Sequence, residues 1–331
     1  MSPLDHLSRL DAAQLGTGLS AENARAGWAA AVRCAREVEI ERVIHGEPPR
    51  CITIVASANV FTAPLEWAWA LSARGVRVIL KSARHLSVVG EALAEMIPGV
   101  EHREWRGGDV AAEQAAFAES DAAIVFGSAE TIAEITGRSR IPVLGFGPRF
   151  GIAQLATLGA REAEGVALDH VLYDGRGCMS PAAVFVHGGV DLDVMASAMA
   201  HAQVVWPRGE VSPAEAVEMR ALSMLARVEG RMSGGADWLV VELPARHFRP
   251  RGLPRAVVIH RADRAEVVRT LAPWGAQLGT VAGLACPTAL RECAVGEMQT
   301  PRGDRLTHDG VDVLAELWAI GGRRERSALH S

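Results

Sequence analysis

Apolar and polar positions along the first half of the chain form short blocks that predict a β-strand, then a helix, several times over. Uninterrupted apolar runs predict buried strands at 51–56, 76–80, 100–105, 122–126 and 142–146. Apolar residues at helical spacing predict helices at 63–74, 86–96, 111–119 and 129–136. This alternation indicates βαβ units around a parallel sheet, covered on both faces because its strands are apolar throughout. The predicted fold class is therefore α/β.

The pattern on either side of these blocks is less regular. A helix is predicted at 20–45, before the first strand. The second half predicts strands at 183–187, 238–243 and 256–260, a further apolar run at 279–284, and helices at 191–202, 213–232, 262–271 and 311–320. The second of these helices opens with a capping box formed by Ser212 and Glu215. With a boundary near residues 147–155, we expect domains at 1–150 and 151–300 and a C-terminal segment at 301–331.

Composition and charge narrow the possible functions. Of the 331 residues, 49% are hydrophobic, which is enough to form a folded core. The net charge of −5 gives no reason to expect binding to nucleic acid or to an anionic membrane. The N-terminus lacks the apolar core of a signal peptide, and the longest uncharged stretch, 51–65, is too short and too polar to span a bilayer. These features predict a cytoplasmic protein.

One of the five cysteines, Cys178, is a candidate nucleophile because of its sequence neighbours. The five cysteines are too few and too irregularly spaced to predict a disulfide framework. None forms a CxxC pair, which disfavours a structural zinc site, and no metal ligand is assigned. Four cysteines, at positions 34, 51, 286 and 293, lie in apolar segments or flank a stretch that looks helical, which favours packing. Cys178 lies in a glycine-rich turn, where Arg176 or backbone amides could lower the thiol pKa and favour the nucleophilic thiolate. A cysteine with no chemical role is the alternative on these local features.

Polar residues also follow three predicted strands, at the carboxyl ends where ligands bind in open α/β sheets. The first strand is followed by Ser57 and Asn59, the second by Lys81 and Ser82, and the fourth by Gly127 and Ser128. Such residues often act only as turn or cap residues. Because Lys81 is the only lysine of the chain, the set together favours a dinucleotide or phosphate site. The GxGxxG fingerprint and the P-loop motif are both absent.

Three segments together resemble the aldehyde dehydrogenase superfamily, in particular its bacterial acyl-CoA reductase branch, the reductase subunit of the luminescence fatty-acid reductase system. Residues 54–82 are similar to the strand, oxyanion Asn, helix, strand and cofactor-binding Lys of the superfamily. Residues 124–147 resemble its Gly-Ser turn at the cofactor phosphates, and 175–186 its nucleophile loop with the following strand. The stretch from Gly296 to Leu317 also resembles this branch.

The resemblance implies a Rossmann-type cofactor domain, an α/β catalytic domain and a thioester mechanism. Cys178 would attack an acyl-CoA or acyl-carrier thioester, with the oxyanion held by the Asn59 amide and the Cys178 backbone N–H. Hydride from NADPH, with NADH left open, would then give the aldehyde. The residues implied to bind the cofactor are Ser57, Lys81, Ser82, Gly127 and Ser128. Aldehyde-oxidising members carry a Glu in the stretch that corresponds to 145–148, and its absence here favours reduction over hydrolysis.

Two other functions compete with this one. The first is an acyl carrier, a non-reducing subunit that accepts an acyl group on Cys178 within a fatty-acid-modifying complex. The second is a Cys-His acyl hydrolase, for which His170, His187 and His201 are the candidate bases. A homo-oligomer or partner acyl-transfer subunits are possible assemblies.

Overall fold

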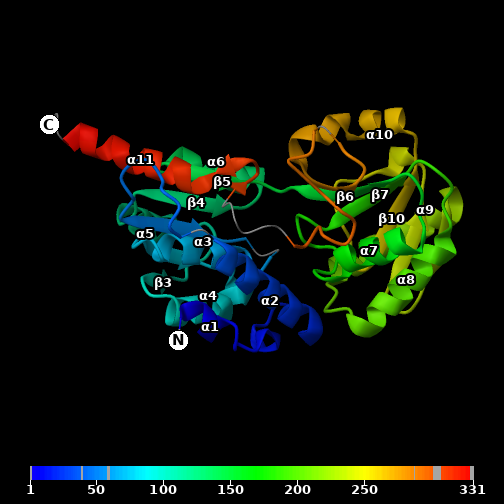
Figure 1. Cartoon of the computed structure of the whole chain (residues 1–331), viewed down its shortest axis with the longest axis horizontal. Helices are drawn as coiled ribbons and strands as arrows, with labels where there is room; N and C mark the ends of the chain where they lie inside the picture. The colour runs from blue at the N-terminus through cyan, green and yellow to red at the C-terminus, as the bar shows by residue number, and fades with distance from the viewer. Residues whose placement is uncertain (1, 39, 58–59, 287, 301–306, 329–331) are drawn as a thin grey trace. The chain divides into compact units, whose positions relative to one another are not determined.

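The computed structural model describes residues 2–38, 40–57, 60–286, 288–300 and 307–328. The chain falls into two compact units, each with its own sheet (Figure 1). The first unit comprises Met1–Thr17, Trp28–Pro148 and Arg302–Ser331, and the second comprises Gly18–Gly27 and Arg149–Pro301. Among the described residues, no helix combines the length and the apolar character needed to cross a membrane.

The sheet of the first unit has five parallel strands in the order β3-β2-β1-β4-β5. These strands are β1 (Cys51–Val55), β2 (Arg77–Lys81), β3 (Val100–His102), β4 (Ala122–Phe126) and β5 (Val143–Phe146). Val55 pairs with Lys81 on one side and with Val125 on the other, so the carboxyl ends of β1, β2 and β4 are level. Both β1 and β4 are buried along their whole length, which confirms the predicted parallel sheet covered on both faces.

Helices and one hairpin surround this sheet. The helices of the first unit are α1 (Pro3–Leu7), most of α2 (Ala21–Glu37), α3 (Ala63–Ser72), α4 (Ser87–Met96), α5 (Val110–Ala118), α6 (Ala129–Arg138) and α11 (Val313–Ala328), with short 3-10 turns η1 (Ala12–Gln14) and η2 (Arg84–Leu86). The hairpin pairs β13 (Thr307–His308) with β14 (Val311–Asp312). Its His308 ring packs edge-on against Phe126 and Phe146, with centroids 5.2 and 4.6 Å away. The hairpin therefore covers the carboxyl ends of β4 and β5.

The sheet of the second unit has seven strands in the order β12-β11-β6-β7-β10-β9-β8, and of these only the β8–β9 pair is antiparallel. These strands are β6 (Phe150–Leu155), β7 (Pro181–Val186), β8 (Arg231–Gly234), β9 (Leu239–Glu242), β10 (Ala256–Arg261), β11 (Leu278–Gly283) and β12 (Arg291–Cys293). The helices are α7 (Ala160–Val171), α8 (Leu192–Val205), α9 (Pro213–Glu229) and α10 (Arg264–Leu271), with η3 (Ala245–His247) and η4 (Ala272–Gln277).

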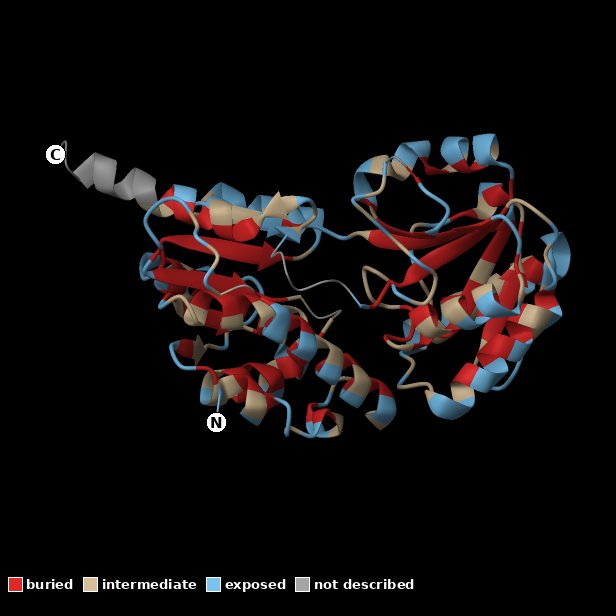
Figure 2. Ribbon diagram, viewed as in Figure 1, coloured by how far each residue is buried: buried red, intermediate tan, exposed pale blue. Residues whose placement is uncertain are grey.

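Alternate residues of β7 enter two separate cores. Val184 and Val186 pack in one core with residues of α7 and α8. Ala183 and Phe185 pack in the other with Leu271 of α10. Figure 2 shows the inner strands of both sheets coloured mainly as buried, whereas edge strands such as β8 carry intermediate and exposed residues. Most other exposed residues lie on the helices and in the loops. Since side chains of a strand point alternately to its two faces, apolar residues at every position are what a doubly covered sheet requires.

The structure differs from the sequence analysis at several boundaries. The helix predicted at 20–45 ends at Glu37. The stretch 286–293, which looked helical, instead leads into strand β12. Helix α9 ends at Glu229 and the chain continues directly into β8, because the polar sequence 231–234 forms an edge strand and not a further helical turn. Strand β6 and helix α7 were not predicted, since the buried Gln154 and a mixture of charges obscure their apolar periodicity.

We expect Ile54→Ala to lower the free energy of unfolding by about 2–5 kcal/mol, because Ile54 is fully buried in the central strand β1 and its truncation leaves a cavity. Val88 on α4 is 45% exposed, so Val88→Ala should change that free energy by less than about 0.5 kcal/mol. Denaturant unfolding of both variants measures the difference. Equal losses in the two variants would show that β1 does not carry the core.

Candidate functional site

The residues predicted to hold a dinucleotide lie at one edge of the first sheet. Lys81 is the last residue of β2, Ser57 follows β1, and Gly127 and Ser128 follow β4. Because these strands are neighbours and run in parallel, their carboxyl ends bring the four residues to the same edge. Asn59 lies outside the described residues.

The side chain of Lys81 is half-buried, and its ammonium has no hydrogen-bond or ion-pair partner among the described residues. Burial lowers the pKa of Lys81 from its usual value, and the carboxylate of Glu113 opposes that shift. Glu113 is itself bonded to Arg138 at 2.7 and 2.9 Å. The Lys81 ammonium could therefore bind an anion, such as a phosphate, at this edge of the first sheet.

The two serines at this edge already have structural partners. The hydroxyl of Ser82, a buried residue, lies 2.8 Å from Nε2 of His102. Ser128 is the N-cap of α6, and its hydroxyl accepts a hydrogen bond from the Thr131 amide at 3.2 Å. Ser128 therefore does act as a helix cap. The ten-residue helix α6 begins directly after it, at the carboxyl end of β4, and the unpaired backbone amides at a helix N-terminus attract anions.

Cys178 lies in the second unit, on the connection between α7 and β7, and its side chain is half-buried. The chain turns there through two residues in the left-handed region, Asp174 with a φ of 53° and Gly175 with a φ of 70°. A Cβ on Gly175 would come within 2.5 Å of the His170 ring, so only glycine fits. A backbone hydrogen bond of 2.9 Å across residues 177–180 closes the turn around Cys178.

The buried carboxylate of Asp174 fixes the loop that carries the predicted nucleophile Cys178, residues 174–180, which we call the nucleophile loop. Its Oδ1 accepts a hydrogen bond from Nε of Arg255 at 2.5 Å, and both side chains are 0% exposed. Its Oδ2 accepts from the Gly209 amide at 3.0 Å and from Nη1 of Arg176 at 3.3 Å. The buried Asn23 amide lies 3.5 Å from Oδ1. One carboxylate thus joins α2, the α8–α9 connection and the start of β10 to the nucleophile loop.

Arg176 anchors the loop rather than serving as a free activating cation. Its guanidinium binds the Glu215 carboxylate on α9 at 2.7 and 3.1 Å, in addition to its contact with Asp174. The two carboxylates compensate its positive charge. Of the two sources of thiol activation that the sequence suggested, the backbone amides around Cys178 are therefore the better supported.

A second buried carboxylate, Asp169 at the end of α7, ties the segment after β12 to the same loop. It accepts hydrogen bonds from the amides of Gly296 at 2.7 Å and Met298 at 2.8 Å. Burial raises the pKa of Asp169 to about 7, although the two amides act in the opposite direction. The Gln299 amide group donates to the Asp169 carbonyl at 2.7 Å and to the Ser180 hydroxyl at 2.9 Å, which supports the loop from a second side.

The other four cysteines are in settings that disfavour nucleophilic chemistry. Three of them are buried: Cys34, Cys51 and Cys286. Cys293 in β12 is half-buried, and burial raises the pKa of its thiol to about 11. Its reactive thiolate is therefore scarce at neutral pH.

Asp174 and Arg255 were missed as functional residues because they are 81 positions apart and belong to no motif. The available signal was weak: each is a charged residue close to the start of a continuous apolar strand, where a buried charge needs a partner.

We expect Asp174→Ala to lower the free energy of unfolding by about 3–5 kcal/mol, because it leaves the buried Arg255 guanidinium without its counterion. Asp237 provides a matched control, since it is 45% exposed and pairs with Arg208 at 2.6 Å. Asp237→Ala should cost less than about 1 kcal/mol. Denaturant unfolding compares the two, and a small loss in both would contradict the anchoring role of Asp174.

Known structures share this architecture. The NAD-dependent benzaldehyde dehydrogenase from Corynebacterium glutamicum has a TM-score of 0.67 and 13% identity, over 90% of this chain and 80% of that chain. The gamma-glutamyl-gamma-aminobutyraldehyde dehydrogenase from Burkholderia cenocepacia has a TM-score of 0.66 and 16% identity, over 85% and 68%. The NADP-dependent glyceraldehyde-3-phosphate dehydrogenase from Bacillus halodurans has a TM-score of 0.63 and 14% identity, over 87% and 72%. At these identities the likeness shows the fold, which is that of the aldehyde dehydrogenases.

No curated protein matches the sequence. The family model described as acyl-CoA reductase (LuxC) matches residues 44–319. That range contains the strand-end residues of the first sheet and the nucleophile loop of the second unit, and it confirms the resemblance found in the sequence. The chain belongs to the acyl-CoA reductase (LuxC) family.

Proposed function

We propose that the chain reduces an acyl-CoA or acyl-carrier thioester to the aldehyde, with Cys178 as nucleophile and NADPH as hydride donor. The observation that carries this proposal is the setting of Cys178 in a chain of the reductase family: a half-buried thiol on a loop that buried charges hold in place. The first unit would bind the dinucleotide and the second would hold the acyl group.

The reaction begins when the Cys178 thiolate adds to the thioester carbonyl. The backbone N–H of Cys178 and the side-chain amide of Asn59 stabilise the oxyanion by hydrogen bonding. The carbon–sulfur bond to the leaving thiol then breaks, and the acyl group stays on Cys178. NADPH, when bound, would supply the hydride that reduces the acyl carbon held on Cys178. Cleavage of the Cys178–carbon bond releases the aldehyde, so one NADPH and one proton are consumed and NADP⁺ and the free thiol are formed.

The dinucleotide fits the edge of the first sheet described above. Lys81 would bind the adenosine ribose and its 2′-phosphate, since its ammonium has no partner among the described residues. Ser57 and Ser82 would lie beside the ribose, and Gly127 and Ser128 would meet the pyrophosphate at the start of α6.

The hydrolase alternative has less support. Burial lowers the pKa of His170 to about 4, so this residue is a poor proton acceptor. His187 follows β7 whereas Cys178 precedes it, and a six-residue strand spans roughly 20 Å. His201 lines a surface hollow on α7 and α8 with Glu164 and other residues. The carrier alternative uses the same cysteine and differs only in lacking the reduction step.

We expect Cys178→Ala to lower NADPH-dependent aldehyde formation at least about a thousandfold, since it removes the nucleophile. Cys293→Ala is the matched control and should keep its activity, because that thiol is protonated at neutral pH. The assay is NADPH oxidation with a panel of acyl-CoAs and acyl-carrier proteins, together with intact-protein mass. An acyl adduct on Cys178 that NADPH does not discharge would instead identify a carrier.

We expect Lys81→Met to raise the Kd of NADPH at least about tenfold and that of NADH less, because a charge-assisted contact to the 2′-phosphate is worth about 1.5–3 kcal/mol. Lys81 is the only side-chain amine of the chain, so reductive methylation followed by peptide mass spectrometry reports on this one position. Bound NADPH should protect it. Undiminished labelling with NADPH bound would place the dinucleotide elsewhere.

A further inference from the structure

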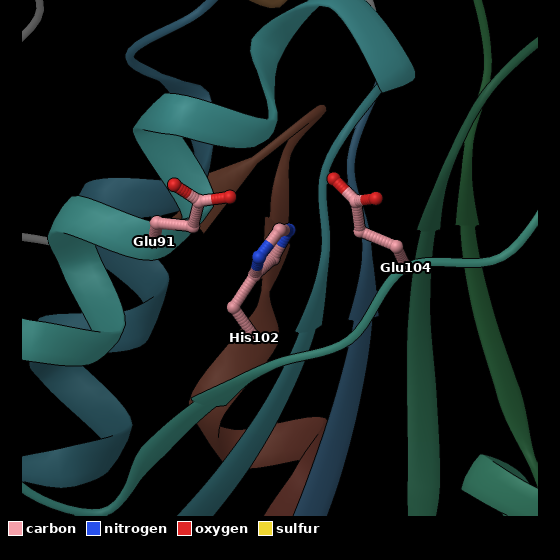
Figure 3. Close-up of side chains that lie close together, drawn as sticks. All are labelled: Glu91, His102 and Glu104. Atoms are coloured by element: carbon pink, nitrogen blue, oxygen red, sulfur yellow. The ribbon is translucent and has the colours of Figure 1, made fainter.

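A cluster of potential metal ligands lies in the first unit, formed by residues that the thioester chemistry does not use. Glu91 on α4, His102 at the end of β3 and Glu104 just after β3 each offer one ligand atom, and these atoms lie within 4.8 Å of one another. Figure 3 shows the imidazole between the two carboxylates. We propose that these three side chains bind a divalent transition-metal ion.

The imidazole is held in an orientation that suits a metal ligand. Its Nε2 lies 2.8 Å from the hydroxyl of the buried Ser82. A Cβ on Gly90 would come within 2.3 Å of its Cδ2 and 2.4 Å of Nε2, so that edge of the ring packs directly on the backbone of α4. Nδ1 therefore points away from Gly90, and it makes no hydrogen bond with any described residue. A hydrogen bond to one ring nitrogen is the arrangement that fixes the other as a metal ligand.

The charge of the cluster also favours a cation. No Arg, Lys or His among the described residues forms an ion pair with Glu91 or Glu104. The imidazole thus lies between two carboxylates that have no ion-pair partner among the described residues. A divalent ion would neutralise both carboxylates and coordinate an imidazole nitrogen.

The donor set indicates which ions fit. One imidazole and two carboxylates provide a mixed nitrogen and oxygen site, which suits Zn²⁺, Co²⁺ and similar first-row ions. Three protein ligands leave at least one position for water. The two glutamates are exposed and can approach the fixed imidazole, so closure of the site would cross-link α4 to the segment after β3.

The sequence predicts no metal ligand at these positions, and the spacing of the three residues explains why. Glu91 precedes His102 by eleven positions and Glu104 follows it by two, a pattern that matches no zinc motif. The parallel arrangement of β2 and β3, with α4 between them in sequence, is what brings the three side chains together.

Titration of the full chain, stripped of metal and reduced, with Co²⁺ tests the proposal. We expect saturable binding of one ion with weak visible absorption and without the intense ultraviolet band that a thiolate ligand adds, and with Zn²⁺ we expect the melting temperature to rise. The double variant Glu91→Gln/Glu104→Gln should weaken binding at least about a hundredfold, tenfold for each lost ligand. Both substitutions lie on the surface, so the variant should fold, which its melting curve without metal verifies.

Glu95→Gln is the matched control, because Glu95 is exposed one turn further along α4 and lies outside the cluster. It should bind Co²⁺ as the unaltered chain does. Binding that is equal in the double variant and the control would overturn the proposal, and so would the absence of saturable binding. Since the readout is metal binding and not turnover, the result is independent of whether the chain is a reductase.

Discussion

Both sheets are covered on two faces, and this constraint decides where polar chemistry can occur. In β1, β4, β6 and β7 every residue is buried, so the interiors of these four strands present no polar side chain to a ligand, whereas strands such as β5 and β8 are partly exposed. Functional groups are therefore restricted to strand ends. The residues proposed to bind the dinucleotide and His102 lie at the carboxyl ends in the first unit, whereas Cys178 and Arg255 precede their strands in the second.

The restriction also accounts for the buried ion pair between Asp174 and Arg255, which lies beside the loop of the proposed nucleophile Cys178. A loop between a helix and a strand has few apolar contacts of its own, and Cys178 needs a fixed backbone if its N–H is to stabilise an oxyanion. Asp174 meets that need by accepting hydrogen bonds from several elements at once. Burying a carboxylate and a guanidinium costs free energy of desolvation, and a buried pair of this kind adds little net stability. Its value lies in specifying one conformation of the loop.

The sequence predicted those features of the fold that depend on the local pattern of apolar and polar residues. Continuous apolar runs predicted the strands of the first sheet to within a few residues, and the strand-end rule placed Lys81 and Gly127 correctly. Prediction failed where a tertiary contact decided the outcome. Strand β12 exists because it pairs with β11 at the sheet edge, and the partners of Asp174 are separated from it by tens of residues. The role suggested for Arg176 was altered in the same way, since Glu215 on a distant helix compensates its charge.

Ser82 is one of the residues proposed to contact the dinucleotide, and its hydroxyl also contacts His102 of the proposed metal site. A hydroxyl offers one donor and two acceptor positions. If Nδ1 of His102 coordinates a metal, Nε2 carries the proton and donates to the Ser82 oxygen. The Ser82 hydroxyl hydrogen then remains free to point toward a ribose oxygen beside Lys81. Without a metal the imidazole can adopt the opposite tautomer, and the same hydrogen is used on Nε2. Metal binding would therefore orient a cofactor-contacting donor without touching the cofactor itself.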